Sequence, residues 1–154
     1  MNKHFCFTQI SSINQSNVLK SNALILPSYS IKNGIEYNLN HCAVWDTGAT
    51  ISVIDSKIIT ELNLSPIIGP TAIISLPGHE DKSNFYYVDI VLPGNIFLQK
   101  FPVLCMDNYH DCDIIIGMDI ITLGDFCVTR YNNKVMFSFM FPHGKPIDFT
   151  NELK

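Results

Sequence analysis

The feature that most constrains the fold is a series of short apolar runs, rich in Ile, Val, Phe and Tyr. Turn residues bound these runs, as at Pro93-Gly94-Asn95 and Asn132-Asn133. Runs of about four to eight such residues between turn signals are typical of β-strands. The pattern predicts strands at 4–10, 22–31, 38–45, 51–55, two within 70–92, 96–106, 112–116, 126–131 and 135–141.

Two segments change to a helical period. Ile58, Ile59 and Leu62 recur at helical spacing, and either Asp55 or Ser56 can cap the start, so a short helix is predicted over 56–63. A second short helix is predicted at about 118–123, after Gly117. Many short strands with two short helices predict a mainly β fold that closes into a barrel or a sandwich.

Composition narrows the class of protein. The chain has 154 residues, of which 47% are apolar, and this is enough for one domain with a solid core. The ten Lys and Arg residues are scattered and the formal net charge is −4, so we expect no nucleic-acid partner.

The number of cysteines and the polarity of the first twenty residues indicate the cellular compartment. Five cysteines is an odd number, and the opening twenty residues are too polar for a signal peptide, so a cytoplasmic, intracellular setting with free thiols is expected. The longest apolar runs are under about ten residues, so no membrane partner is expected.

Asp46 is the most informative acidic residue. It follows the apolar run Ala43-Val44-Trp45 and precedes Thr47-Gly48-Ala49-Thr50. On a strand, Cys42, Val44 and Asp46 share one face, and a carboxylate at such a strand end is costly unless it is hydrogen-bonded. The alternative is an ordinary turn in which Asp bonds its own backbone, since Asp-Thr-Gly occurs by chance in roughly a few per cent of chains this long.

A second glycine supplies the context. Ile114-Ile115-Ile116 runs into Gly117 and then into the second helix, and a hairpin with Pro77-Gly78 near its tip lies between Asp46 and Gly117. This order resembles the retropepsin family, the single-lobe aspartic proteases of retroviruses and their cellular and bacterial relatives. The resemblance covers roughly 23–141.

The resemblance implies a closed, β-barrel-like acid-protease single lobe with two short helices, which acts as a homodimer. The domain occupies 23–141, with an N-terminal extension over 1–22 and a C-terminal tail over 142–154. The chain has one Asp-Thr-Gly, so the second carboxylate must come from a second copy. The implied activity is that of an aspartic endopeptidase, in which two Asp46 carboxylates share a proton and activate a water molecule to cleave peptides between hydrophobic residues.

The resemblance also assigns roles to particular residues. Asp46 is the catalytic acid, and Thr47 locks the two loops together across the dimer axis. No cofactor and no metal are required. The remaining positions support the active-site loop (Gly48, Ala49, Thr50), form a flap over the substrate (Ser75, Leu76, Pro77, Gly78, His79) or build the second loop of the site (Ile115, Ile116, Gly117).

Departures and alternatives stay open. Met118 stands where many viral members carry an arginine, so ion-pair support of the loop is not expected there, and Asp119 follows, as in many cellular relatives. The segment 135–141 fits either a dimer interface or a core strand. The segment 4–10 fits either a dimer interface or a disordered tail. Other readings are a peptide-binding or dimerisation module with weak or no hydrolysis, an unrelated β-barrel with a chance triplet, and zinc at His4-Phe5-Cys6 or His110-Asp111-Cys112.

Overall fold

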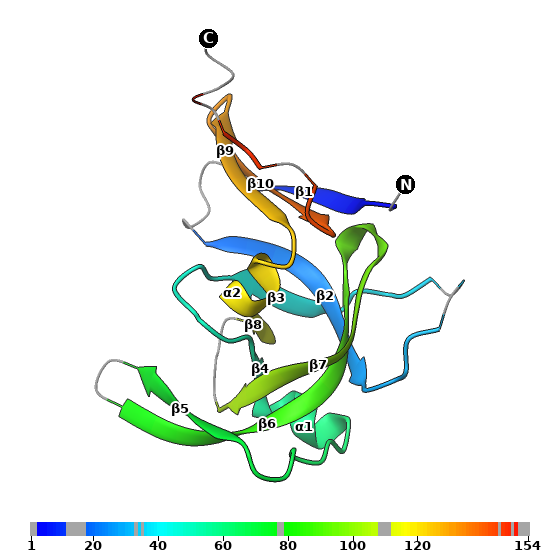
Figure 1. Ribbon diagram of the computed structural model, residues 1–154, viewed down its shortest axis with the longest axis vertical. Helices are drawn as coiled ribbons and strands as arrows, with labels where there is room; N and C mark the ends of the chain where they lie inside the picture. The colour runs from blue at the N-terminus through cyan, green and yellow to red at the C-terminus, as the bar shows by residue number, and fades with distance from the viewer. Residues whose placement is uncertain are drawn as a thin grey trace.

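The computed structural model describes residues 3–11, 18–32, 34, 36–76, 79–107, 112–144, 146–148 and 150. Strands dominate the chain, as expected, and the helices are short (Figure 1). The elements are β1 (Phe5–Ser11), β2 (Leu19–Pro27), β3 (His41–Trp45), β4 (Val53–Asp55), α1 (Ser56–Glu61), β5 (Thr71–Leu76), β6 (His79–Leu92), the 3-10 turn η1 (Pro93–Asn95), β7 (Ile96–Met106), β8 (Ile114–Ile116), α2 (Met118–Ile121), β9 (Asp125–Tyr131) and β10 (Lys134–Phe141).

Six strands form a closed barrel. Their order is β2-β3-β8-β4-β7-β6, and β2 closes the ring by pairing with β6. Closure depends on one strand with two partners: residues 19–23 of β2 pair with β3, and residues 24–27 pair with β6. The predicted closed, barrel-like fold is therefore confirmed.

Strand β5 lies outside this ring. It pairs only with the first part of β6, and the two strands project from the barrel as a long hairpin (Figure 1). The last pair in its register is Leu76 with His79. Pro77 and Gly78, the predicted tip, lie outside the described residues.

A separate three-stranded sheet, β1-β10-β9, packs on one side of the barrel. The β9–β10 hairpin turns at Asn132 and Asn133, whose φ values of 48° and 58° suit the primed turn expected for a tight hairpin. Strand β1 pairs with β10 of the same chain over its whole length. The 4–10 segment is thus a strand of this sheet, and 135–141 is a strand with two buried aromatic residues, Phe137 and Phe139.

The core is divided by the two faces of β3. Ala43 and Trp45 belong to the main core, while Cys42 and Val44 pack against a smaller cluster formed by Val53, Leu104, Met106, Cys112 and Ile115. Trp45 stacks on Phe126 at 5.5 Å between ring centroids and donates its indole N–H to Ser21 Oγ. The predicted alternation along this strand is therefore confirmed, and Asp46 follows directly on a well-packed strand.

Several element boundaries differ from those expected. Strand β2 begins at Leu19 and ends at Pro27, because the chain turns at Tyr29, where φ is 64°. Helix α1 ends at Glu61 and α2 spans only Met118–Ile121. Of the two residues expected to cap α1, Asp55 does so, by accepting a hydrogen bond from Lys57 N–H.

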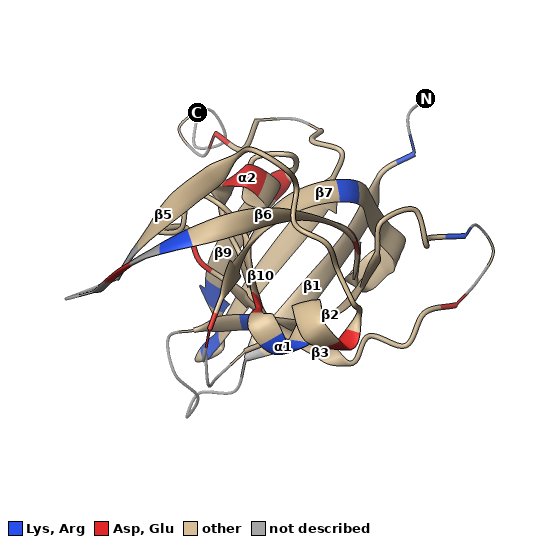
Figure 2. Cartoon of the chain, turned by 90° about the horizontal axis from the view of Figure 1, so that it is seen from below, with Lys and Arg blue, Asp and Glu red and all other residues tan. Residues whose placement is uncertain are grey.

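Charged residues of both signs are spread over many elements (Figure 2). In the part of the chain that the structure describes, no helix has the length and apolar character needed to cross a membrane.

Candidate active site

Asp46 leaves β3 at the point where this strand runs beside β8. The two strands are parallel, with Trp45 opposite Ile116, and Asp46 N–H donates to Ile116 O at 3.0 Å. The backbone of the acid is therefore fixed by the same apolar-apolar-glycine segment that the sequence singled out.

The turn after Asp46 fixes its carboxylate. Gly48 N–H donates to Asp46 Oδ1 at 2.8 Å, and Ala49 N–H donates to Asp46 O at 3.2 Å. A Cβ atom at Gly48 would lie 3.1 Å from the same carboxylate oxygen, so glycine suits this close approach. Among the described residues, no hydrogen-bond donor contacts the other carboxylate oxygen, and the half-buried acid faces a cleft.

Gly117 lies where the second loop crosses the Asp46 loop. A Cβ atom there would meet the carbonyl carbon of Ile51 at 2.8 Å and Ala49 O at 3.0 Å, both of which are backbone atoms. Just beyond the crossing, Met118 N–H donates to Ala49 O at 2.8 Å. Glycine is therefore required at this position by the contact itself.

Two residues that the sequence did not select join these loops. Ser52 Oγ donates to Asp119 Oδ1 at 2.6 Å and accepts from Gly117 N–H at 3.0 Å. Ser52 N–H donates to Asp119 Oδ2 at 2.9 Å. In the sequence, only Asp119, two residues after Gly117, gave a sign of this network. Its partner Ser52 lies 67 positions away, so no local pattern connects the two residues.

The Asp46 carboxylate opens into a cleft of about 380 Å³. Strand β5 contributes Ala72, Ile73 and Ile74 to its lining, and we call the apolar residues Val53, Leu104, Met106 and Ile115 its floor. The lining residues are Asp46, Gly48, Ala49, Thr50, Ile51, Val53, Ala72, Ile73, Ile74, Leu104, Met106 and Ile115.

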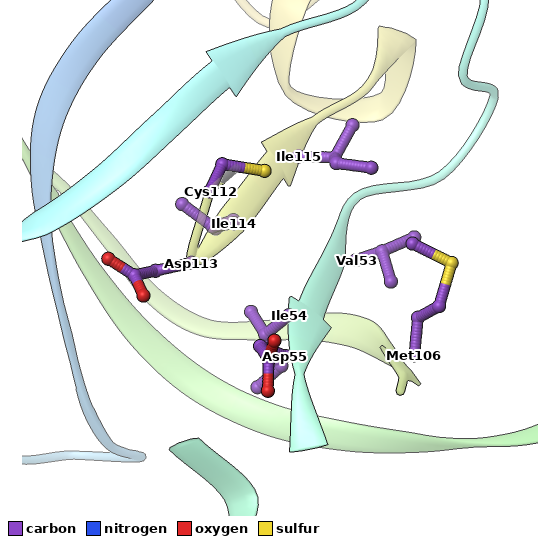
Figure 3. Close-up of a pocket in the computed structure, with 8 residues that line it drawn as sticks. All are labelled: Val53, Ile54, Asp55, Met106, Cys112, Asp113, Ile114 and Ile115. Atoms are coloured by element: carbon purple, nitrogen blue, oxygen red, sulfur yellow. The ribbon is translucent and has the colours of Figure 1, made fainter. Parts of the chain in front are cut away.

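Val53, Met106 and Ile115 of the floor also line a narrow crevice beside β4 (Figure 3). Val53 and Met106 lie next to each other in this view, while Asp113 lies on the opposite side of β4 and points away from them. The crevice has essentially no room for a water-sized molecule, so it is a packing seam of the smaller core cluster.

Asp113 belongs to a polar group at the start of β3. Burial acts to raise the pKa of its carboxyl, but the ion pair with Lys57 Nζ at 2.6 Å and the hydrogen bond from Cys42 N–H hold that pKa below its usual value. This carboxylate is already paired and does not line the cleft, so it does not offer Asp46 a second acid within the chain.

The structure brings most of the predicted site residues together. The cleft beside Asp46 is lined by Gly48, Ala49, Thr50 and Ile115. Ile116 and Gly117 contact the backbone of the Asp46 loop, and Thr47 is exposed on the turn. For the predicted flap residues, the backbone of Ser75, Leu76 and His79 is in the β5–β6 hairpin. The described part of the chain contains no group of three or more His, Cys, Asp or Glu side chains placed to hold a metal ion.

A search with models of known protein families finds no match. Among solved structures, the chain is similar to a crystal structure of a retropepsin-like aspartic protease from Rickettsia conorii, with a TM-score of 0.56. The likeness covers 91% of this chain and 98% of that chain, at 14% sequence identity. The chain has the retropepsin-like fold. The fold expected from Asp46-Thr47-Gly48 and Gly117 is thereby confirmed.

Among curated proteins, a GDSL esterase/lipase of Arabidopsis thaliana is 33% identical over 90 residues. The chain spans about a fifth of the length of this relative, and the match covers 57% of the chain. The match therefore carries no argument about the chemistry of the Asp46 cleft.

Proposed function

We propose that the protein is an aspartic endopeptidase whose active site forms when two copies each contribute Asp46. One observation carries the proposal: a half-buried carboxylate, oriented by Gly48 N–H, opens into an apolar cleft on a retropepsin-like lobe. The turn that presents this acid occurs once in the sequence, so a pair of such acids requires a second chain. The exposed Thr47 is available to contact the partner's turn.

The chemistry follows from two close carboxylates. They cannot both be ionised, so the pair shares one proton and titrates as a unit. The ionised member removes a proton from a water molecule as that water attacks the peptide carbonyl. The protonated member hydrogen-bonds the carbonyl oxygen and helps proton delivery to the leaving nitrogen. No covalent enzyme intermediate is formed.

The walls of the cleft indicate the substrate class. An extended peptide between β5 and the floor would add backbone hydrogen bonds as an extra strand. The side chains it meets include Ile73, Ile74, Leu104 and Met106. We therefore expect cleavage between hydrophobic residues in an exposed, extended segment of a protein or peptide.

The test is a mixed-peptide digest, read by mass spectrometry, with the wild type, Asp46→Asn and Asp125→Asn. Asp125 accepts a hydrogen bond from Gly144 N–H and does not line the cleft, so its variant is a matched control. We expect cleavage at about pH 4–7 by the wild type and by Asp125→Asn, and none by Asp46→Asn. Equal cleavage by Asp46→Asn would exclude this mechanism, and peptide binding without cleavage by the wild type would favour a binding module.

A further inference from the structure

We propose that Ser52 and Asp119 form a positioning pair that holds the Asp46 loop in its reactive geometry. The inference rests on the proposed function for its effect on catalysis, but its structural part is independent of activity. Met118, directly after Gly117, carries no charge, so it cannot support this loop through an ion pair.

Ser52 is the centre of the network. Ser52 is fully buried, with 0% exposure, and its hydroxyl acts as both hydrogen-bond donor and acceptor. The hydroxyl donates to Asp119 Oδ1 and accepts from Gly117 N–H, so it connects the end of the Asp46 loop to the crossing point. A buried hydroxyl with both functions satisfied fixes its rotamer and its neighbours.

Asp119 anchors the network to α2. Its Oδ1 also accepts from Ile120 N–H at 2.9 Å, and its Oδ2 accepts from Ser52 N–H. The carboxylate therefore receives hydrogen bonds from three donors, one on α2 and two on Ser52. An amide in its place would turn an N–H₂ group toward at least one of these donors.

Together these contacts hold the loop at both ends. At its start, Asp46 N–H is bonded to Ile116 O, and at its end Ser52 is bonded to Asp119 and Gly117. Loosening the far end leaves the loop held at its start by Asp46 N–H and in its middle by the hydrogen bond from Met118 N–H to Ala49 O. Small displacements of a reacting group lower the turnover rate by up to about 100-fold. Neither Ser52 nor Asp119 lines the cleft. The hydrogen bond from Leu104 N–H on β7 to Ser52 O joins backbone atoms that the side-chain variants keep, so substrate binding should change little.

Asp89 offers a matched control. It likewise accepts three hydrogen bonds, from the backbone N–H groups of Ser30, Ile31 and Lys100, and it is fully buried, whereas Asp119 is partly buried. It does not line the cleft, and its three donors lie outside the Asp46 loop. Asp89→Asn should therefore cost as much stability as Asp119→Asn or more, without changing the loop.

The experiment combines peptide-cleavage kinetics with amide hydrogen exchange measured by NMR for the wild type, Ser52→Ala, Asp119→Asn, the double variant and Asp89→Asn. We expect Ser52→Ala and Asp119→Asn to lower kcat by about 10- to 100-fold with KM changed less than about threefold. The double variant should lose no more than the worse single variant, because the two residues act as one unit.

Exchange separates this inference from the proposed function. At Asp46, Gly117 and Met118, exchange should accelerate at least about tenfold more in Asp119→Asn than in Asp89→Asn. That result without cleavage by the wild type would refute the protease and retain the positioning pair. Equal exchange at these three amides in both variants would overturn the pair, as would an unchanged kcat in an active enzyme.

Discussion

At the scale of single residues, local and long-range signals differ in what they reveal. Asp46, Gly48 and Gly117 stand out in the sequence because a strand end, a tight turn and a close crossing each demand a particular residue type. Ser52 does not stand out, because a buried serine is recognised only when its partners, Asp119 and Gly117, are known. When a residue acts through a partner more than sixty positions away, the sequence around it shows no pattern that reveals this role.

His41 gives a prediction about pH. Its Nδ1 accepts a hydrogen bond from Ile25 N–H at 3.1 Å, next to the point where β2 leaves β3 and joins β6. Burial lowers the pKa of the imidazole below its ordinary 6.5, and the positive charge of Lys57 also lowers it. Asp113 and Glu61 act to raise this pKa, but burial outweighs them.

A lowered pKa means that the unfolded chain binds a proton before the folded chain does. The free energy of unfolding should therefore fall as the pH drops below about 6.5, toward the lower folded-state pKa. His41→Asn keeps an acceptor near the Nδ1 position and cannot be protonated. Urea unfolding between about pH 7.5 and 5.5 should show a flatter pH dependence for His41→Asn than for the wild type. Equal slopes for the two proteins would contradict this account.

At the scale of elements, the strands and both helices were predictable because each has its own period and turn signals. The β9–β10 hairpin is the clearest case, since Asn132-Asn133 suits a turn with two positive φ values. The ends of β2 were not predictable. This strand changes partner between Ala23 and Leu24, and only the closed barrel determines where that change occurs.

Strand β5 gives a prediction about substrate binding. Ile73 lines the cleft and is 66% exposed, so its replacement should cost the folded chain little. We expect Ile73→Ser to raise KM for a hydrophobic peptide by roughly tenfold, with kcat nearly unchanged, because it removes apolar contact with the substrate. Ile68→Ser is the control, since Ile68 is 99% exposed and does not line the cleft. Equal effects of the two changes on KM would remove β5 from the binding site.

At the scale of the whole molecule, the chain is a single retropepsin-like lobe with one candidate catalytic acid. The barrel and the separate sheet form within one chain, and strand β1 is paired inside it rather than left for a partner. The sequence predicted the closed β fold because the apolar runs are short and many. The homodimer, its interface and the boundaries at 22 and 141 remain predictions, because they depend on surfaces that no local pattern specifies.

The central claim is that each active site needs Asp46 from two chains, and mixing tests it most directly. Wild type and Asp46→Asn are combined in varied ratios at constant total concentration, and the cleavage rate is measured after subunit exchange. If one Asp46 from each chain is required and pairing is random, an equal mixture should retain about one quarter of the wild-type rate. A rate of about one half, proportional to the wild-type fraction, would show that each chain works alone and would contradict the account.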